Sequence, residues 1–277
     1  MTDDSPFFLF FWKPRSHFQP GALGNLTLPW GSPPARLADL GSANIHSYAL
    51  VSFLLLVPFG LGLAALVAVA VLARAKAPPG VAEGGPAGGR LSWPAIGYFS
   101  LLGSGFMLFE ISISQRLVLL LGHPAYSISI VLFSFLIFGA IGSTISQAVP
   151  AERLRSAQIF CALAVAAAAS GATLLYPFYV VHFLGQSQTV RTLASVLWVL
   201  PLATLAGMPF PMGLRQIPER QVAWVWAMNG CGSVAGSSLA VALGLLVGFN
   251  STTFIGATAY LLVAAVTAMG AFPRPKA

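Results

Sequence analysis

The sequence predicts an all-α membrane protein with about seven transmembrane helices. The chain of 277 residues is 57% hydrophobic and only 8% charged, and its mean hydropathy of +0.82 is typical of proteins whose solvent is lipid. From Trp93 to Ala271, almost every stretch of about 20 residues is apolar enough to cross the hydrocarbon core as a helix. Strands of a membrane barrel would alternate apolar and polar residues, and these stretches are apolar on nearly all faces. The predicted spans are residues 47–73, 94–121, 125–148, 156–180, 192–210, 222–248 and 251–271.

Residues 1–46 precede the first predicted span and are expected to lie outside the membrane. The part from 16 to 45 is rich in Gly, Pro, Ser and Asn, a composition typical of a connector. The opening MTDDSPFFLFFWKPR has acids where a signal peptide has bases, and its apolar run is too short for the core of a signal. No cleaved signal is therefore expected.

The first predicted span, 47–73, is separated from the other six by residues 74–92. The stretch RAKAPPGVAEGGPAGGR in this segment has several Pro and Gly and almost no large apolar residue. It cannot bury enough surface to fold, so we expect a flexible cytoplasmic linker. A compact six-helix bundle is predicted over 93–277.

The second predicted span carries an acidic residue at its middle, Glu110. An ionisable group at this depth costs several kcal/mol unless it is partnered, so it is a candidate functional residue. At 100° per residue Gly103, Glu110 and Ser114 share one face, which predicts that the carboxylate points at a groove between helices and not at lipid. Three roles stay open: a structural partner of Asn229 or of an arginine, a buried protonated acid, or a proton or cation site in a transport pathway.

Arg116 is a further candidate on the same span. It lies six residues after Glu110, about 240° around the helix, so the two side chains cannot pair within it. Any salt bridge to Glu110 must come from another span.

The loop after the second span predicts a tight hairpin, because GHPAYS places Pro124 at about the first position of the next helix. His123 lies in this loop and is a candidate functional residue. Together with His46 and His182, it falls at the end of a span on the side predicted to be external. No span carries two histidines, so interfacial histidines are preferred to a haem or metal site, and no cofactor is predicted.

Cys161 and Cys231 lie within predicted spans and show no CxxC or Cys/His spacing, so neither a disulfide framework nor a zinc site is indicated. The fifth span ends in GMPFPMGLR, from Gly207 to Arg215. Its two prolines remove backbone donors, so the segment is either a helix stop, which we prefer, or a broken helix lining a cavity. Arg215 is kept as a candidate polar residue.

The sixth predicted span carries a face of small and polar residues. In WAMNGCGSVAGSSLA, Asn229, Ser233, Gly236 and Ala240 fall within about 40° of one another. Such a stripe is typical of closely packed membrane helices. An interhelical seam with one hydrogen-bonding Asn is the preferred interpretation, and a ligand contact through Asn229 is the alternative.

The formal charge of +7 is scattered over helix ends without interleaved aromatic residues, so no nucleic-acid partner is expected. By the positive-inside rule the bias places the C-terminus in the cytoplasm and, with seven spans, the N-terminus outside. One side holds Arg74, Lys76, Arg90, Arg153, Arg155, Arg215, Arg220, Arg274 and Lys276, and the other holds Lys13, Arg15, Arg36 and Arg191.

Three segments carry a resemblance to a known family. GFMLFEISISQRLVLLLGHPAYSISIVLFSFLIFGAIGS, GMPFPMGLR and WAMNGCGSVAGSSLA look like the C-terminal membrane region of spermidine synthase-like integral membrane proteins. In that family a spermidine-synthase or methyltransferase-type Rossmann domain is fused to transmembrane helices, and TDDSPFF resembles the junction after that domain. The resemblance covers most of the chain from Gly97 onward, together with the first few residues. With it we expect a protein of the bacterial inner membrane.

The family's cofactor-binding features have no counterpart here. Its catalytic domain binds intact or decarboxylated S-adenosylmethionine at a glycine-rich turn after a strand, with acidic residues nearby. The sequence shows no such turn, no parallel-strand pattern and no acidic pair. The chain therefore resembles the membrane half of such a protein, and no S-adenosylmethionine-dependent activity is expected of it alone.

The resemblance conflicts with the charge distribution. An enzyme domain before Thr2 would be cytoplasmic, whereas the distribution of basic residues with seven spans places the N-terminus outside. Either FFLFFW with its connector is a shallow re-entrant element, or one predicted span, most readily 156–180, does not cross. Three functions stay open: a non-catalytic membrane module that anchors or partners a separate enzyme, a small proton- or cation-coupled transporter using Glu110, and a structural subunit of a larger membrane complex. The expected partners are the bilayer and other protein subunits, among them a separate spermidine synthase-like enzyme.

Overall fold

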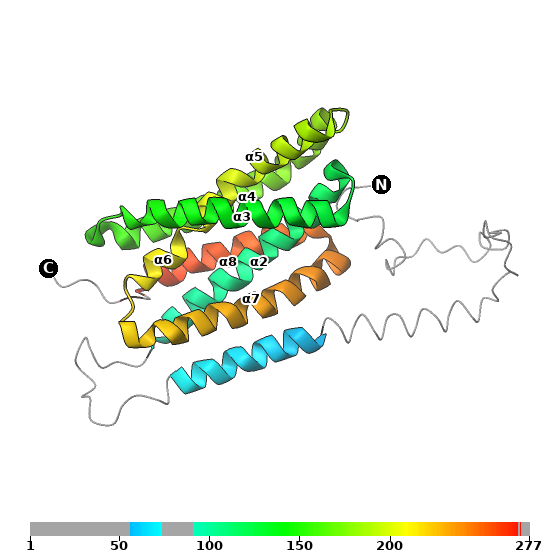
Figure 1. Ribbon diagram of the computed structural model, residues 1–277. Coiled ribbons are helices and arrows are strands. Elements are labelled where there is room, and N and C mark those ends of the chain that lie inside the picture. The colour runs from blue at the N-terminus through cyan, green and yellow to red at the C-terminus, as the bar shows by residue number, and fades with distance from the viewer. Residues whose placement is uncertain (1–55, 74–90, 271, 273–277) are drawn as a thin grey trace, which may run out of the picture.

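The computed structural model describes residues 56–73, 91–270 and 272, and within them it contains helices and no strands. Seven segments are long and apolar enough to cross a membrane, which confirms the all-α, multi-pass prediction. Figure 1 shows them running in roughly one direction as a bundle. The bounds are Leu56–Ala73, α2 (Trp93–Leu121), α3 (Pro124–Gln147), a short 3-10 turn (Ala151–Arg153), α4 (Leu154–Phe183), α5 (Gln188–Ala206), α6 (Pro209–Leu214), α7 (Glu219–Val247) and α8 (Phe249–Ala268).

Each predicted span from 94 onward corresponds to one described helical segment. The predicted span 156–180 lies within α4, a helix of 30 residues that is long enough to cross the bilayer by itself. The expected N-terminal segment 1–46, the start of the first span and the linker as far as residue 90 lie outside the described residues.

The predicted hairpin between the second and third spans is confirmed. Gly122 ends α2 with a φ of 82°, a left-handed conformation that glycine adopts without a steric penalty. Pro124 is the first residue of α3, where its missing N–H costs nothing. The turn is further closed by Ser127, whose hydroxyl donates to the Ser114 carbonyl oxygen at 2.6 Å. The two helices are therefore held as an antiparallel pair.

Helix α2 lies at the centre of the bundle and contacts α3, α7 and α8 (Figure 1). Its seam with α7 forms where glycines remove side-chain volume. A Cβ at Gly103 would collide with the Asn229 backbone oxygen, and one at Gly236 would lie 2.6 Å from the Ser104 Cα. The small-residue seam predicted from the two spans is therefore confirmed. On another face of α2, the rings of Phe109 and Tyr260 stack at 5.3 Å and join α2 to α8.

The fifth span is interrupted between Ala206 and Pro209, at the glycine- and proline-containing segment. α5 stops at Ala206, which confirms the helix stop, and the chain resumes at once as the short helix α6. α6 is packed within the bundle, because Pro209 and Met212 are buried. The Tyr98 hydroxyl donates to the Pro209 carbonyl oxygen at 2.7 Å and fixes the start of α6 against α2.

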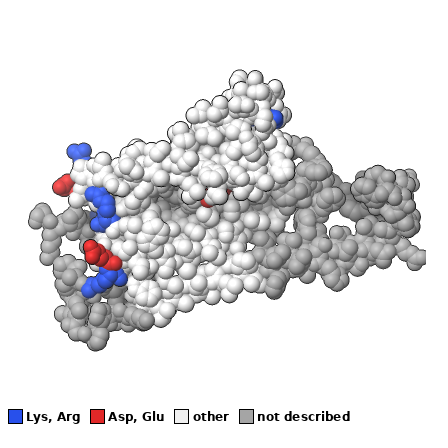
Figure 2. All heavy atoms as spheres, viewed as in Figure 1, with Lys and Arg blue, Asp and Glu red and all other residues white. Residues whose placement is uncertain are grey.

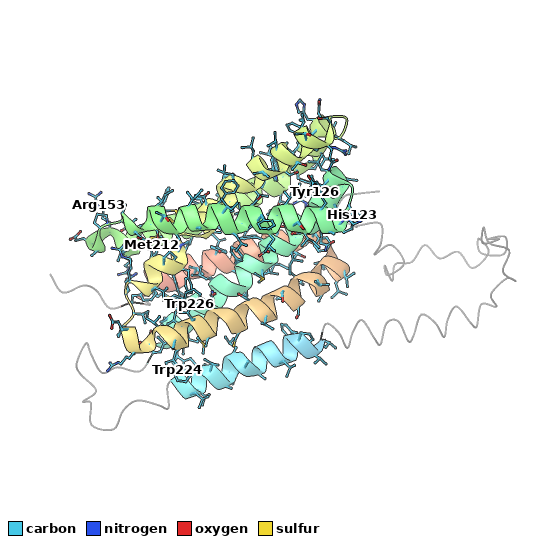
Figure 3. All side chains as sticks on the ribbon, viewed as in Figure 1. His123, Tyr126, Arg153, Met212, Trp224 and Trp226 are labelled. Atoms are coloured by element: carbon cyan, nitrogen blue, oxygen red, sulfur yellow. The ribbon has the colours of Figure 1, made fainter. Side chains whose placement is uncertain are left out.

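The described charges lie mainly at one end of the bundle. Figure 2 shows basic and acidic side chains gathered at the left-hand end, where α3, α4 and α7 begin or end, on an otherwise white surface. Figure 3 places Arg153 and Met212 at this end and His123 and Tyr126 at the opposite one. The distribution has the form that the positive-inside argument expects, with a basic end and a nearly uncharged end.

Candidate functional site

Glu110 occupies the middle of the central helix. It follows Trp93 by 17 residues and precedes Leu121 by 11, so its depth is close to the centre of a membrane-spanning α2. The side chain is half-buried. Within the described residues no group donates a hydrogen bond to its carboxylate and no cation pairs with it. Its backbone oxygen accepts a hydrogen bond from the Ser114 hydroxyl at 2.7 Å.

The half-buried Glu110 side chain is partly exposed in the apolar part of the bundle. Figure 2 shows a small red area recessed in the white surface, in the part of the view where Figure 1 draws α2. Glu110 is the one described acidic residue that lies away from the charged end, since the other two, Glu152 and Glu219, stand at the starts of helical segments there. We call this recess the Glu110 hollow. The predicted face shared with Gly103 is thus only partly covered by another helix.

Asn229 is not the partner of Glu110. Its side-chain amide donates to the Phe99 carbonyl oxygen of α2 at 3.2 Å, and its backbone packs on Gly103. This contact is the interhelical hydrogen bond that the preferred interpretation expects. The amide thus serves the α2–α7 seam.

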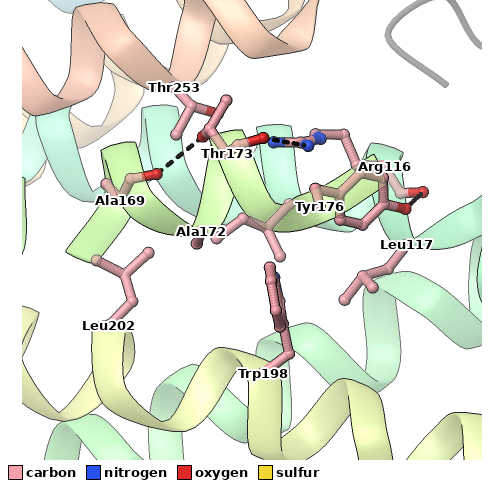
Figure 4. Close-up of a pocket in the computed structure, with 10 residues that line it drawn as sticks. Arg116, Leu117, Ala169, Ala172, Thr173, Tyr176, Trp198, Leu202 and Thr253 are labelled. Atoms are coloured by element: carbon pink, nitrogen blue, oxygen red, sulfur yellow. Dashed lines mark hydrogen bonds between the residues drawn. The ribbon is translucent and has the colours of Figure 1, made fainter. Parts of the chain in front are cut away.

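Arg116 is bound to α4 instead of Glu110. It is only 4% exposed, and its guanidinium carbon lies 4.0 Å from the centroid of the Tyr176 ring, a cation–π distance. One terminal nitrogen donates to the Thr173 carbonyl oxygen at 3.4 Å, while the Tyr176 hydroxyl donates to the Arg116 carbonyl oxygen at 2.5 Å. These reciprocal contacts join α2 to α4, and Figure 4 shows them around a small cavity.

The cavity beside Arg116 is too small for a substrate. Its volume is about 10 Å³, roughly the space of one water molecule. Trp198 of α5 and Thr253 of α8 contribute to its walls (Figure 4). The contacts of Arg116 with Thr173 and Tyr176 form a buried polar joint where α2, α4, α5 and α8 meet. We call it the Arg116–Tyr176 joint.

His123 and Arg215 act at helix ends. The His123 Nδ1 accepts from the Ala125 backbone N–H at 3.3 Å and caps the start of α3. Arg215 donates to the Ser146 carbonyl oxygen, in the last turn of α3, at 3.2 Å. It also donates to the Val149 carbonyl oxygen, just after α3, at 2.9 Å. Both side chains are exposed and satisfy backbone groups that a helix leaves open.

Two other arginines also donate hydrogen bonds to backbone carbonyl oxygens at the ends of helices. Arg191 of α5 donates to the Leu120 carbonyl oxygen at 3.0 Å, at the C-terminal end of α2. Arg155 of α4 donates to the Ala268 carbonyl oxygen at the end of α8. Guanidinium groups near helix C-termini also interact favourably with the helix dipole. The arginines therefore connect helices.

The described residues contain no group of three or more His, Cys, Asp or Glu arranged to hold a metal.

A buried polar network was missed by the sequence interpretation. Gln158 of α4 is fully buried and donates from its side-chain nitrogen to the Tyr98 hydroxyl at 3.1 Å. The Gln216 amide donates to the Gln158 side-chain oxygen at 2.9 Å and to the Met212 carbonyl oxygen at 3.1 Å. Gln158 in an otherwise apolar span was the available signal. Because each member contacts the next, the network positions α6 against α2 and α4.

Comparison of the chain with protein-family models, with curated proteins and with solved structures found no match. The resemblance to spermidine synthase-like membrane proteins remains a prediction from the sequence. The site must therefore be interpreted from its own geometry. Four of the five predicted polar residues are bonded into the bundle, and Glu110 is the one whose side chain remains open to an outside group.

Proposed function

We propose that the chain is a non-catalytic integral membrane module that binds another membrane component through the Glu110 hollow. The observation that carries this proposal is the half-buried carboxylate at mid-helix depth, which receives no hydrogen bond from the described residues. Ionisable groups at such depth are usually paired or face a water-filled cavity. A partner that covers the hollow would supply the missing pairing.

The remaining polar groups support a scaffold more than a transporter. Arg116, Asn229 and Gln158 are engaged in contacts that join helices. A proton or cation pathway needs a succession of polar groups across the bilayer. The described polar contacts lie instead at helix seams and helix ends. A module of this kind would act by holding a separate enzyme or subunit at the membrane, as the resemblance to the membrane half of spermidine synthase-like proteins implies.

The proposal includes an orientation. The basic end of the bundle, with Arg153 and Arg215, would face the cytoplasm of a bacterial cell, and the C-terminus would lie on the same side. A partner enzyme using a soluble cofactor would then be held at the cytoplasmic face.

Purification from native membranes tests the proposed function. The chain is extracted in a mild detergent without crosslinking, and co-eluting proteins are identified and quantified by mass spectrometry. We expect a stoichiometric membrane partner with the parent chain and its loss with Glu110→Leu, while Glu152→Gln, at the charged end, keeps it. A parent chain that elutes without any stoichiometric partner would contradict the proposal.

A further inference from the structure

The depth of the Glu110 hollow restricts what can occupy it. The hollow lies over the middle of α2, so an occupant must be embedded in the hydrocarbon region. A protein segment at that depth has to satisfy its own backbone hydrogen bonds, and a helix does so without help from water. Lipid headgroup amines remain at the membrane surface. A protein segment that occupied the hollow would therefore be a transmembrane helix.

The chemistry of the hollow restricts the helix further. One turn before Glu110 on α2, Phe106 packs its ring edge-on against Phe135 of α3 at 5.2 Å, which gives the carboxylate an apolar neighbour. The nearest basic residue along α2, Arg116, is directed to Tyr176 of α4. Within the described residues the Glu110 carboxylate has no hydrogen bond or ion pair, so it can bind a group from outside. A basic side chain is its complement in charge and in hydrogen bonding.

We propose that a transmembrane helix of a partner protein docks in the Glu110 hollow and places a Lys or Arg side chain against the carboxylate. This inference rests on the proposed function and adds to it the chemical identity of the partner's contact. Apolar residues of the partner helix cover Phe106 and its neighbours, and the ion pair selects this helix over purely apolar ones. Such a polar contact adds specificity in lipid, because apolar helix surfaces compete with equally apolar lipid tails.

The test uses the full chain in phosphatidylcholine vesicles and synthetic Leu-rich transmembrane helices. One peptide carries a single Lys at its centre and the other carries Leu there, and binding is measured by energy transfer between labelled chain and peptide. We expect the Lys peptide to bind about tenfold more tightly, the magnitude of one intramembrane polar contact. The preference should disappear with Glu110→Leu and persist with Glu152→Gln.

Equal binding of the two peptides to the parent chain would overturn the inference, and this comparison does not depend on any variant folding. A preference that survives in Glu110→Leu would overturn it as well, since the Lys would then be bound elsewhere. Energy transfer between two labelled copies of the chain that Glu110→Leu abolishes, with no binding of either peptide, would instead assign the hollow to a second copy and overturn the inference. These outcomes differ from failure of the proposed function, which is the absence of a native partner.

Discussion

At the scale of single residues, the polar side chains of the bundle are used mainly to satisfy backbone groups. Arg215 and Arg191 each donate to carbonyl oxygens at the end of a helix other than their own. Arg116 combines a carbonyl contact with stacking on Tyr176. Such bonds matter in lipid because water is not available to replace them. Glu110 is the exception, because no described residue bonds its carboxylate.

The Arg116–Tyr176 joint predicts a measurable loss of stability. Tyr176→Phe removes the hydroxyl that donates to the Arg116 carbonyl oxygen and should cost about 1 kcal/mol. Tyr176→Leu also removes the ring under the guanidinium and should cost roughly 1–2 kcal/mol more. Thermal unfolding of the purified chain in detergent measures both. Tyr126→Phe, at an exposed tyrosine bonded to Thr192, is the control and should change stability little; equal losses at both positions would argue against the joint.

Glu110 predicts the opposite behaviour. Because no described residue bonds its carboxylate, Glu110→Leu should leave the isolated chain as stable as the parent or make it more stable. Glu110→Gln should fold equally well. If Leu lowered the unfolding temperature of the isolated chain while Gln did not, an internal partner would have to exist, and the interpretation of the hollow as an open site would fail.

At the scale of elements, close approach between helices organises the bundle. The α2–α7 seam depends on Gly103 and Gly236, at each of which a Cβ would collide with the facing backbone. At the α5–α6 break, the Tyr98 hydroxyl donates to the Pro209 carbonyl oxygen. Both arrangements place backbone or carbonyl groups where lipid could not satisfy them. The α2–α7 seam in addition leaves no room for a methyl group at either glycine.

Two glycines of α2, one in the seam and one outside it, allow a matched comparison of substitutions. Gly103→Ala should destabilise the chain by roughly 1–3 kcal/mol, because its methyl group overlaps Asn229. Gly97→Ala adds the same atoms where nothing lies within 4 Å and should be neutral or stabilising by about 0.5–1 kcal/mol. Unfolding in detergent compares the two. A similar response at both positions would show that the seam is looser than described.

At the scale of the whole molecule, the sequence predicted the class and the spans because lipid imposes a strong constraint on length and composition. The helix stop at Ala206 and the hairpin at Pro124 followed from proline and glycine chemistry. The seam glycines also followed from helical periodicity.

Long-range partners could not be predicted in the same way. Helical periodicity places Glu110 and Gly103 on one face, but it does not say how far α7 covers that face. The network of Gln158 with Tyr98 joins residues 60 positions apart, and the pairing depends on how α4 packs on α2. Nothing in the local sequence of Arg116 indicates that Tyr176 lies beneath it. The sequence therefore predicted which residues are candidates, and the packing of the helices was needed to show which groups each of them contacts.

The orientation of the bundle gives a prediction at this scale. In a chain without Cys161 and Cys231, a cysteine at Ser187 should react with a membrane-impermeant maleimide added to intact cells, because the α4–α5 loop would face outward. A cysteine at Glu219, at the start of α7, should react only after the membrane is opened. The reverse pattern would show that the basic end faces outward.

The measurement that tests the central claim most directly is labelling of Glu110 by dicyclohexylcarbodiimide, an apolar reagent that adds to protonated carboxyl groups from the lipid phase. The purified chain should be modified at Glu110, because the hollow is open, and the adduct is located by mass spectrometry. In native membranes a partner helix with a basic side chain should protect the same residue. Equal labelling of Glu110 in native membranes and in the purified chain, or no labelling in either, would contradict the account.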